Sequence, residues 1–276
     1  MKKLVAIFLI LMFLCGCANN IPATESTEAS KETLTEAENI QTVYLLKRMH
    51  MADAGGMTIL SREYQYSELG WKTEELEYNE TGSLDCRTVF SYNAEGLCVA
   101  QEISYMDDGQ TVSVTVIHRV YDDQGRAVRI QYYEDGQLGN TTTLTYDDHG
   151  NCLTNNTEAV GFLSYTYEYD ARGNVVKKEE FMDGDLIYTV TCRYDEQNRC
   201  VEEITANFEG VVETRTVSVC ENNTETTTCY DGEGILFLTL ISVYDDQGNL
   251  IRQENYYSDS SAIISEYVYE AIEISR

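Results

Sequence analysis

One stretch of six residues decides the fold of this 276-residue chain because it recurs: Tyr169-Asp170-Ala171-Arg172-Gly173-Asn174. Copies of its Tyr-Asp-x-x-Gly pattern stand at 121–126, 146–151 and 244–249, and the copy at 194–199 has Asn in place of Gly. Successive anchoring tyrosines lie 23–29 residues apart from Tyr66 to Tyr194, and the last step is 50 residues. A fixed period in this range indicates a repeat architecture.

Each copy has the chemistry of a tight turn. The Asp carboxylate accepts hydrogen bonds from backbone N–H groups further along the turn, and Gly adopts a positive φ without a Cβ clash. Asn is the best substitute for Gly at such a site. The residues that fill these two roles are Asp122 and Gly125, Asp147 and Gly150, Asp170 and Gly173, Asp195 and Asn198, and Asp245 and Gly248. These acidic residues therefore need no catalytic explanation.

Two further kinds of turn complete the repeat. The double step predicts a degenerate copy of the repeat turn at 219–224, where Asn stands at the fourth turn position. Asp-Gly pairs follow most anchors by about a dozen residues, at 107–109, 134–136 and 182–184, and such pairs favour two-residue hairpin turns. One repeat of about 24–25 residues thus consists of two strands and two turns.

The segments between turns alternate as strands do. Leu163, Tyr165, Tyr167 and Tyr169 point to one face, and the polar residues between them point to the other. Counting segments gives about 18 strands, and the short connections impose an antiparallel up-and-down meander. Open sheets rarely exceed about ten strands without curling or splitting. We therefore expect an all-β protein whose single long sheet is twisted and coiled, with a conventional sandwich as the alternative.

The N-terminus has the features of a secretion signal. A basic start, Met1–Lys3, precedes an apolar run, Leu4–Leu14, that is shorter than the roughly 20 residues of a spanning helix. The run ends Leu14-Cys15-Gly16-Cys17, which resembles the lipobox of bacterial lipoproteins. The resemblance implies a signal peptide over 1–16, lipidation of Cys17 and a bacterial protein anchored on the extracytoplasmic face of the cell membrane. An ordinary secretory signal with an incidental cysteine is the alternative.

Residues 17–40 and 41–276 differ in composition. The first segment is rich in Ser, Thr, Glu and Ala, which favours a flexible acidic linker. An amphipathic helix could be drawn over 36–49, but a first strand from about Thr42 places a turn within 51–57. We therefore predict that the repeat domain occupies 41–276.

The repeat itself resembles the YD-repeat (RHS-repeat) family. The Tyr-Asp-x-x-Gly-Arg/Asn core and its spacing carry the resemblance over about 60–276. It implies a long sheet of hairpin repeats and no particular activity. Large members of the family wind such strands into shells around toxic cargo, whereas this chain is more similar to the small repeat lipoproteins of bacterial surfaces.

The charge of the chain limits the classes of partner that it can bind, and its cysteine content bears on whether it forms disulfides. With 19 basic and 47 acidic residues, the surface repels nucleic acid and anionic lipid, so we expect membrane contact through the N-terminal lipid alone. Seven cysteines in 41–276 do not suggest a disulfide framework. Cys98, Cys152 and Cys200 stand where sister repeats have small apolar residues, which predicts buried free thiols.

No signature of catalysis or cofactor binding is present in the sequence. It lacks H-E-x-x-H, G-x-S-x-G, P-loop and G-x-G-x-x-G patterns, and it has three histidines. The paired acids of the repeat turns suggest calcium, but neighbouring turns should lie ~10 Å apart, too far to share an ion readily. We expect no enzyme activity, no cofactor and no defined metal site.

A binding or scaffolding role remains. The candidate surface is a row of tyrosines, because aromatic faces combined with hydroxyls suit glycans and other surface polymers: Tyr165, Tyr167, Tyr169, Tyr188 and Tyr194. These tyrosines could equally serve only to stabilise the sheet. The partner is then an extracytoplasmic glycan or protein, and the protein is a monomer. The alternative is an immunity or inhibitor lipoprotein that caps a partner protein by adding a strand at a free sheet edge.

Overall fold

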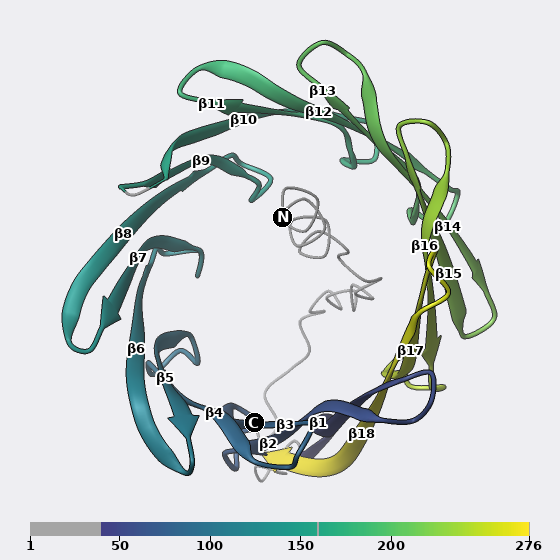
Figure 1. The fold of residues 1–276 in the computed structure, drawn as a ribbon. Coiled ribbons are helices and arrows are strands. Elements are labelled where there is room, and N and C mark those ends of the chain that lie inside the picture. The colour runs from purple at the N-terminus through teal and green to yellow at the C-terminus, as the bar shows by residue number, and fades with distance from the viewer. Residues whose placement is uncertain (1–39, 159, 276) are drawn as a thin grey trace, which may run out of the picture. The chain divides into compact units, whose positions relative to one another are not determined.

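The computed structural model of the protein describes residues 40–158 and 160–275 (Figure 1). They belong to one compact unit, Asn39–Arg276. The proposed signal peptide at 1–16, Cys17 and nearly all of the linker at 17–40 lie outside the described residues.

The described chain consists of strands joined by short turns, and their number and type confirm the all-β meander expected from the sequence. The first strand takes the place of the alternative helix over 36–49. The 18 strands are β1 Ile40–Asp53, β2 Thr58–Tyr66, β3 Lys72–Asn79, β4 Leu84–Tyr92, β5 Cys98–Asp107, β6 Gln110–Tyr121, β7 Ala127–Glu134, β8 Gln137–Tyr146, β9 Cys152–Thr157, β10 Gly161–Tyr169, β11 Val175–Met182, β12 Asp185–Tyr194, β13 Cys200–Asn207, β14 Val212–Glu221, β15 Thr224–Asp231, β16 Leu236–Tyr244, β17 Leu250–Tyr257 and β18 Ala262–Ser275.

The sheet closes into a β-barrel, so the predicted open, coiled sheet is wrong on this point, and so is the alternative sandwich (Figure 1). Each strand pairs antiparallel with the next, and β1 pairs with β18 from Ile40↔Ser275 to Asp53↔Ile263. The physical reason for closure is that the first and last strands of an open sheet leave rows of unpaired backbone N–H and C=O groups. Pairing these two strands with each other satisfies both rows.

The meander places the turns at two opposite rims. The repeat rim carries the turns at 66–72, 92–98, 121–127, 146–152, 169–175, 194–200, 221–224 and 244–250. The opposite rim carries those at 53–58, 79–84, 107–110, 134–137, 157–161, 182–185, 207–212, 231–236 and 257–262. Strand β1 starts at the repeat rim and β18 ends there, so the described chain enters and leaves the barrel at the same end.

The repeat turns have one shared geometry. In the turn at 169–175, Asp170 Oδ1 accepts hydrogen bonds from the backbone N–H groups of Arg172 at 2.8 Å and Asn174 at 2.9 Å, and Gly173 has φ 86°. The same role of Asp and a φ between 67° and 89° at the fourth position recur at Gly125, Gly150, Asn198 and Gly248. A register shift accompanies each of these turns, so each strand following a turn starts one residue out of step.

The degenerate copy predicted at 219–224 is a different turn. Glu221 pairs directly with Thr224, and Asn222 has φ 54°, which defines a two-residue hairpin without a register shift. The period correctly placed a turn here, but the absence of an Asp at position 220 removes the acceptor that the longer turn requires. The longer turn also occurs on the opposite rim, where Asn207 and Asp231 hold the acceptor position.

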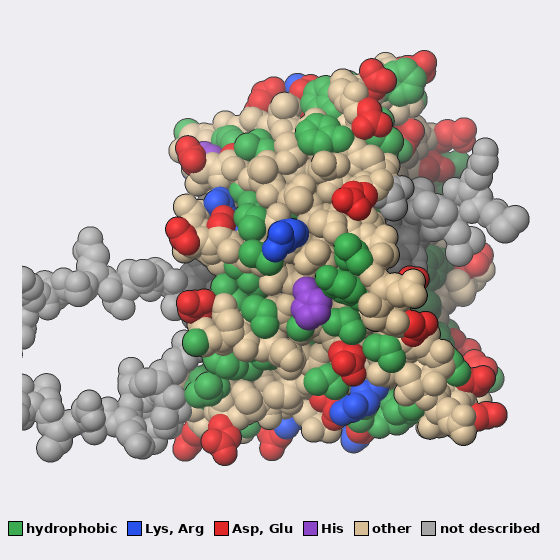
Figure 2. All heavy atoms as spheres, turned by 90° about the vertical axis from the view of Figure 1, so that its left-hand side faces the viewer, with side chains coloured by type: hydrophobic (Ala, Val, Ile, Leu, Met, Phe, Trp, Pro, Cys, Tyr) green, Lys and Arg blue, Asp and Glu red, His purple; other side chains and the backbone are tan. Residues whose placement is uncertain are grey.

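The two faces of the barrel wall differ in burial. Paired residues on neighbouring strands point to the same face of the sheet, so the register divides the side chains of the wall into two sets. One set contains most of the buried residues, such as Thr227, Cys229, Leu240 and Ser265. A concave surface crowds its side chains, so this set forms the inner face. The outer face carries cross-strand ion pairs such as Arg87–Glu74 at 2.6 Å, and Figure 2 shows acidic side chains crowding both margins of the wall.

The cysteines of the barrel differ in how far they are buried. All seven in the described residues are free. Cys98 and Cys152 are half-buried, but Cys200 is exposed, so its predicted burial is wrong. All three begin a strand that directly follows a repeat turn, whereas the buried Cys229 lies inside β15 on the inner face.

The turn carboxylates should make the barrel sensitive to acid. Backbone and side-chain hydrogen bonds lower the pKa of Asp122 and Asp195, both chiefly through the residue that ends the turn, and a bond from Asn174 does the same for Asp170. A carboxyl group whose pKa is lower in the folded state stabilises the fold above its unfolded pKa of about 3.9. This stabilisation is lost as pH falls through the lowered folded pKa. Urea midpoints should therefore drop as pH falls from about 5 to about 3.

The matched control is a triple variant, Asp122→Asn, Asp170→Asn and Asp195→Asn. Asn93 and Asn207 already accept the same turn hydrogen bonds, so this variant keeps the turns and removes three titrating groups. Its midpoint should fall less between these pH values than that of the wild type. Equal falls would show that the turn carboxylates do not contribute.

Candidate functional site on the inner tyrosine face

The structure places the five candidate tyrosines on two strands of the inner face. Tyr165, Tyr167 and Tyr169 lie on β10, and Tyr188 and Tyr194 lie on β12. Strand β11 lies between them and contributes Lys178 and Glu180 to the same face. Their hydroxyl groups divide the tyrosines into two kinds.

Three of the five use their hydroxyl to hold the fold. Tyr167 donates to the Cys152 carbonyl at 2.8 Å, and Tyr194 donates to the Val175 carbonyl at 3.1 Å. Tyr169 donates to the carboxylate of Asp147 and stacks on His149 with ring centroids 4.3 Å apart. Their polar ends are therefore already bonded within the barrel.

The same tie recurs around the wall and explains why tyrosine anchors the repeat. Tyr92 donates to the Lys72 carbonyl at 2.7 Å, and the equivalent bonds are Tyr121 to Cys98 at 2.6 Å and Tyr146 to Ala127 at 2.6 Å. Each acceptor is the first residue of the strand that follows the preceding repeat turn. This contact was not predicted from the sequence, although the spacing of 19–23 residues between donor and acceptor is a signal that could have revealed it.

Tyr165 and Tyr188 are of the second kind. Within the described part of the chain, neither hydroxyl has a hydrogen-bond partner. The register places Glu180 directly between them, since Tyr165 pairs with Glu180 and Glu180 pairs with Tyr188. The row across three strands is therefore tyrosine, carboxylate, tyrosine. Tyr188 is 38% exposed, and it lies near the start of β12 at the opposite rim.

Lys178 completes this group. Its Nζ lies 3.2 Å from Glu180 Oε2 and 4.5 Å from the centre of the Tyr165 ring. The side chains of Lys178 and Glu180 are 16% and 24% exposed, so the ion pair is partly withdrawn from water. We call Tyr165, Lys178, Glu180 and Tyr188 the tyrosine–carboxylate patch.

The electrostatics of the patch favour a hydrogen-bonding role. Burial, together with the negative charge of Glu180, raises the pKa of Tyr165 to about 12. The phenol therefore stays protonated at neutral pH and can donate as well as accept. With a second phenol, a carboxylate and an ammonium group beside it, the patch offers aromatic surface together with donors and acceptors.

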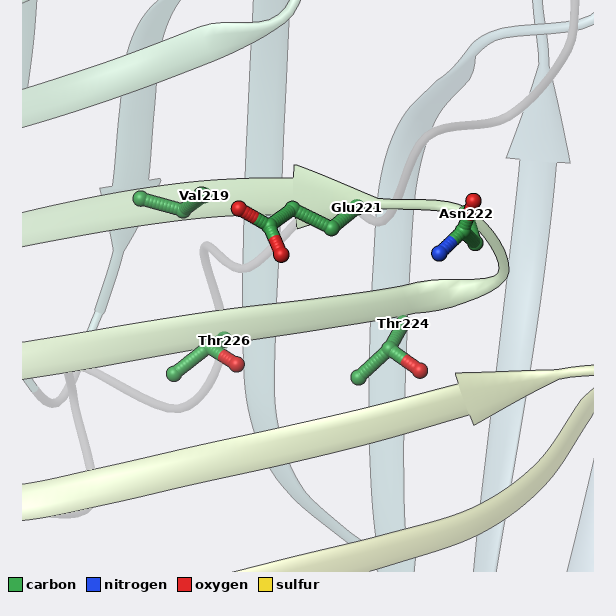
Figure 3. A pocket seen from close by; sticks show the side chains of 5 residues that line it. All are labelled: Val219, Glu221, Asn222, Thr224 and Thr226. Atoms are coloured by element: carbon green, nitrogen blue, oxygen red, sulfur yellow. The ribbon is translucent and has the colours of Figure 1, made fainter.

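A second concave feature lies on the β14–β15 hairpin (Figure 3). It measures about 370 Å³ and is lined by Val219, Glu221, Asn222, Thr224 and Thr226. Its lining belongs to a single two-stranded hairpin at the repeat rim. The polar groups of this lining are one carboxylate, one amide and two hydroxyls.

Two other features are absent from the described residues. They contain no group of three or more His, Cys, Asp or Glu side chains placed to hold a metal ion. In 40–158 and 160–275, no helix reaches the length and apolarity needed to cross a membrane.

Comparison with known proteins gives distant similarities. A family model described as "Uncharacterised protein" matches residues 104–233, and no curated protein matches the sequence. The Tc holotoxin pore of Photorhabdus luminescens is 10% identical over 74% of this chain and 14% of that chain, with a TM-score of 0.27. The TcdB2-TccC3 structure is 12% identical over 81% and 18%, with a TM-score of 0.26.

A porin-like protein from Bacteroides uniformis is 10% identical over 82% of this chain and 98% of that chain, with a TM-score of 0.32. By contrast, the chain spans less than a fifth of the length of the two toxin chains. At these TM-scores, the solved structures identify neither a family nor a ligand for the chain.

Proposed function

We propose that the protein is a non-catalytic binding protein of the bacterial cell surface that is tethered by a lipid on Cys17 and binds a glycan at the tyrosine–carboxylate patch. One observation carries the proposal. Tyr165 and Tyr188 flank Glu180, and their hydroxyl groups make no hydrogen bond within the described residues. The other three candidate tyrosines use their hydroxyl groups in hydrogen bonds within the barrel; they are Tyr167, Tyr169 and Tyr194.

A polyhydroxylated ligand suits this chemistry. Sugar rings present apolar C–H faces that stack on aromatic rings, and hydroxyl groups that exchange hydrogen bonds with phenols and carboxylates. The exposed ring of Tyr188 lies toward the opposite rim, where a polymer could reach the inner face from the end of the barrel. A polymer could add weak contacts along successive repeats.

The closed sheet gives less support to the inhibitor alternative. Strand addition needs a free sheet edge, and every described strand has two neighbours. A protein partner would therefore have to contact the turns or the outer face.

The proposal is tested by glycan-array binding with the Cys17→Ser protein. The double variant Tyr165→Phe/Tyr188→Phe keeps both rings and removes both hydroxyls, and it should bind about tenfold more weakly because two hydrogen bonds are lost. Tyr167→Phe is the matched control: it removes the bond to the Cys152 carbonyl, lowers the urea midpoint and leaves glycan binding unchanged.

Unchanged binding by the double variant would refute the patch as the site. Turnover of any bound glycan would refute the non-catalytic role. The lipid anchor has its own measurement, the mass of the mature N-terminus from the native host. An unmodified N-terminus at a residue other than Cys17 would remove the tether from the proposal.

A further inference from the structure

The opposite rim has a one-sided charge composition. Its nine turns contain no Lys, Arg or His. The same turns contain many acidic residues, which are Asp53, Glu80, Asp107, Asp108, Glu134, Asp135, Glu158, Asp183, Asp185, Glu209, Asp231, Glu233 and Asp259. This end of the barrel is therefore uniformly anionic.

The same rim also exposes large apolar side chains. Met57 is 69% exposed and Phe208 is 64% exposed, and Val160, Val211 and Ile235 are each more than half exposed. All of these residues lie within the turns at this rim. Phe208, Val211 and Ile235 lie on two consecutive turns of this rim, 207–212 and 231–236, so this is where its exposed apolar side chains gather, as they do at interaction surfaces. Acidic and apolar side chains thus share one ring of turns.

The repeat rim provides the contrast. Its turns carry basic side chains, including Arg126, Arg172 and Arg199, and Leu69 is the large apolar side chain in the described repeat-rim turns that is more than a third exposed. The barrel wall is the same at both ends. The difference between the rims therefore lies in what the turns present to solvent.

Equivalent turn positions show that the fold does not require this composition. The third position of the longer turn holds His149, Arg172 or Glu95 on the repeat rim, and Glu209 or Glu233 on the opposite rim. At the second position, the opposite rim has Phe208 where the repeat rim has polar residues such as Asp123. Turn geometry is kept in each case through the backbone and the first residue.

We propose that the opposite rim is a docking surface for a partner protein or peptide that presents apolar side chains surrounded by Lys and Arg. Charge complementarity identifies this partner, because an anionic ring with apolar side chains matches a cationic amphipathic surface. A second copy of the same rim would set acid against acid.

The test uses the Cys17→Ser protein and fluorescence anisotropy with a labelled amphipathic peptide built from Lys and Leu. The comparison probes are a scrambled peptide of the same composition, which has no apolar face, and polylysine. We expect the amphipathic peptide to bind at least about tenfold more tightly than either comparison probe. Raising the salt concentration should weaken binding without abolishing it, because the apolar contacts remain.

The diagnostic variant is Phe208→Ser/Ile235→Ser, which removes two exposed apolar side chains without touching a turn hydrogen bond. It should bind the amphipathic peptide about tenfold more weakly. Leu69→Ser on the repeat rim is the matched control and should bind as the wild type does. Equal binding of the scrambled peptide, or an unaffected double variant, would overturn the docking surface.

Two further measurements distinguish the docking surface from a self-association surface and from the glycan site. If sedimentation shows a dimer that Phe208→Ser/Ile235→Ser returns to monomer, the rim contacts a second copy and the proposal is wrong. The glycan-site variant Tyr165→Phe/Tyr188→Phe should retain full peptide binding, because its substitutions lie on the inner face. Failure of the glycan proposal therefore leaves the docking surface untouched, and the reverse also holds.

Discussion

Replacing Gly232 by alanine is expected to lower the unfolding free energy by about 3 kcal/mol, the upper end of the usual cost of overpacking. A Cβ atom at Gly232 would overlap the carbonyl oxygen of Val212 and lie 3.3 Å from its carbonyl carbon. These are backbone atoms of the neighbouring strand, so relief requires β14 and β15 to separate at the opposite rim. Urea denaturation followed by circular dichroism measures the effect.

Gly139→Ala is the matched control for this prediction. Gly139 lies in β8 without a positive φ, and the nearest atom to an added Cβ is the carbonyl oxygen of Tyr132 at 3.8 Å, an ordinary contact. Its midpoint should stay near that of the wild type or rise slightly, because alanine restricts the unfolded chain. If the two variants unfold at the same urea concentration, the close approach at Gly232 is not real.

The second large effect is expected for Leu240→Ala. Leu240 is 3% exposed and packs with Cys229 and Leu238 in the buried cluster of the inner face, against Phe237 and Tyr257. Removing a buried leucine side chain costs about 2–5 kcal/mol, since transfer free energy is lost and a cavity remains. Thermal and urea unfolding should both report the loss.

Leu236→Ala tests the same substitution in the same strand. Leu236 is 44% exposed at the start of β16, so its truncation should change stability by less than about 0.5 kcal/mol. Comparable losses for Leu236→Ala and Leu240→Ala would mean that the inner cluster contributes little. Such a result would indicate that the barrel is stabilised mainly by the hydrogen bonds from tyrosine hydroxyls to backbone carbonyls and by the backbone hydrogen bonds between strands.

Local features of the fold could be predicted because they are encoded by neighbouring residues. Alternation in segments such as 163–169 predicts strands, and the Asp and Gly of each repeat turn predict connections with positive φ. Closure depends instead on the pairing of β1 with β18, whose residues are far apart in the sequence. An open coil and a barrel share the same local pattern, so periodicity does not distinguish them. Only the register of the two end strands does.

The candidate site was predicted in the same partial way. Alternation correctly placed Tyr165, Tyr167 and Tyr169 on one face. It did not predict which oxygen atom would accept the hydrogen bond from each hydroxyl group. That assignment depends on register shifts at the turns, which bring the first residue of a strand under the tyrosine of the next repeat. The distinction between tyrosines bonded within the fold and those available to a ligand therefore required the structure.

Closure also changes what duplication of a repeat would do. In an open array, an added repeat lengthens the molecule and leaves its cross-section unchanged. In this barrel, every repeat contributes two strands to the circumference, since β1 and β18 must still meet. One more repeat would add about 10 Å to the circumference and about 1.5 Å to the radius, at ~4.8 Å per strand. Copy number in such a protein thus sets its width, and the length of its strands sets its height.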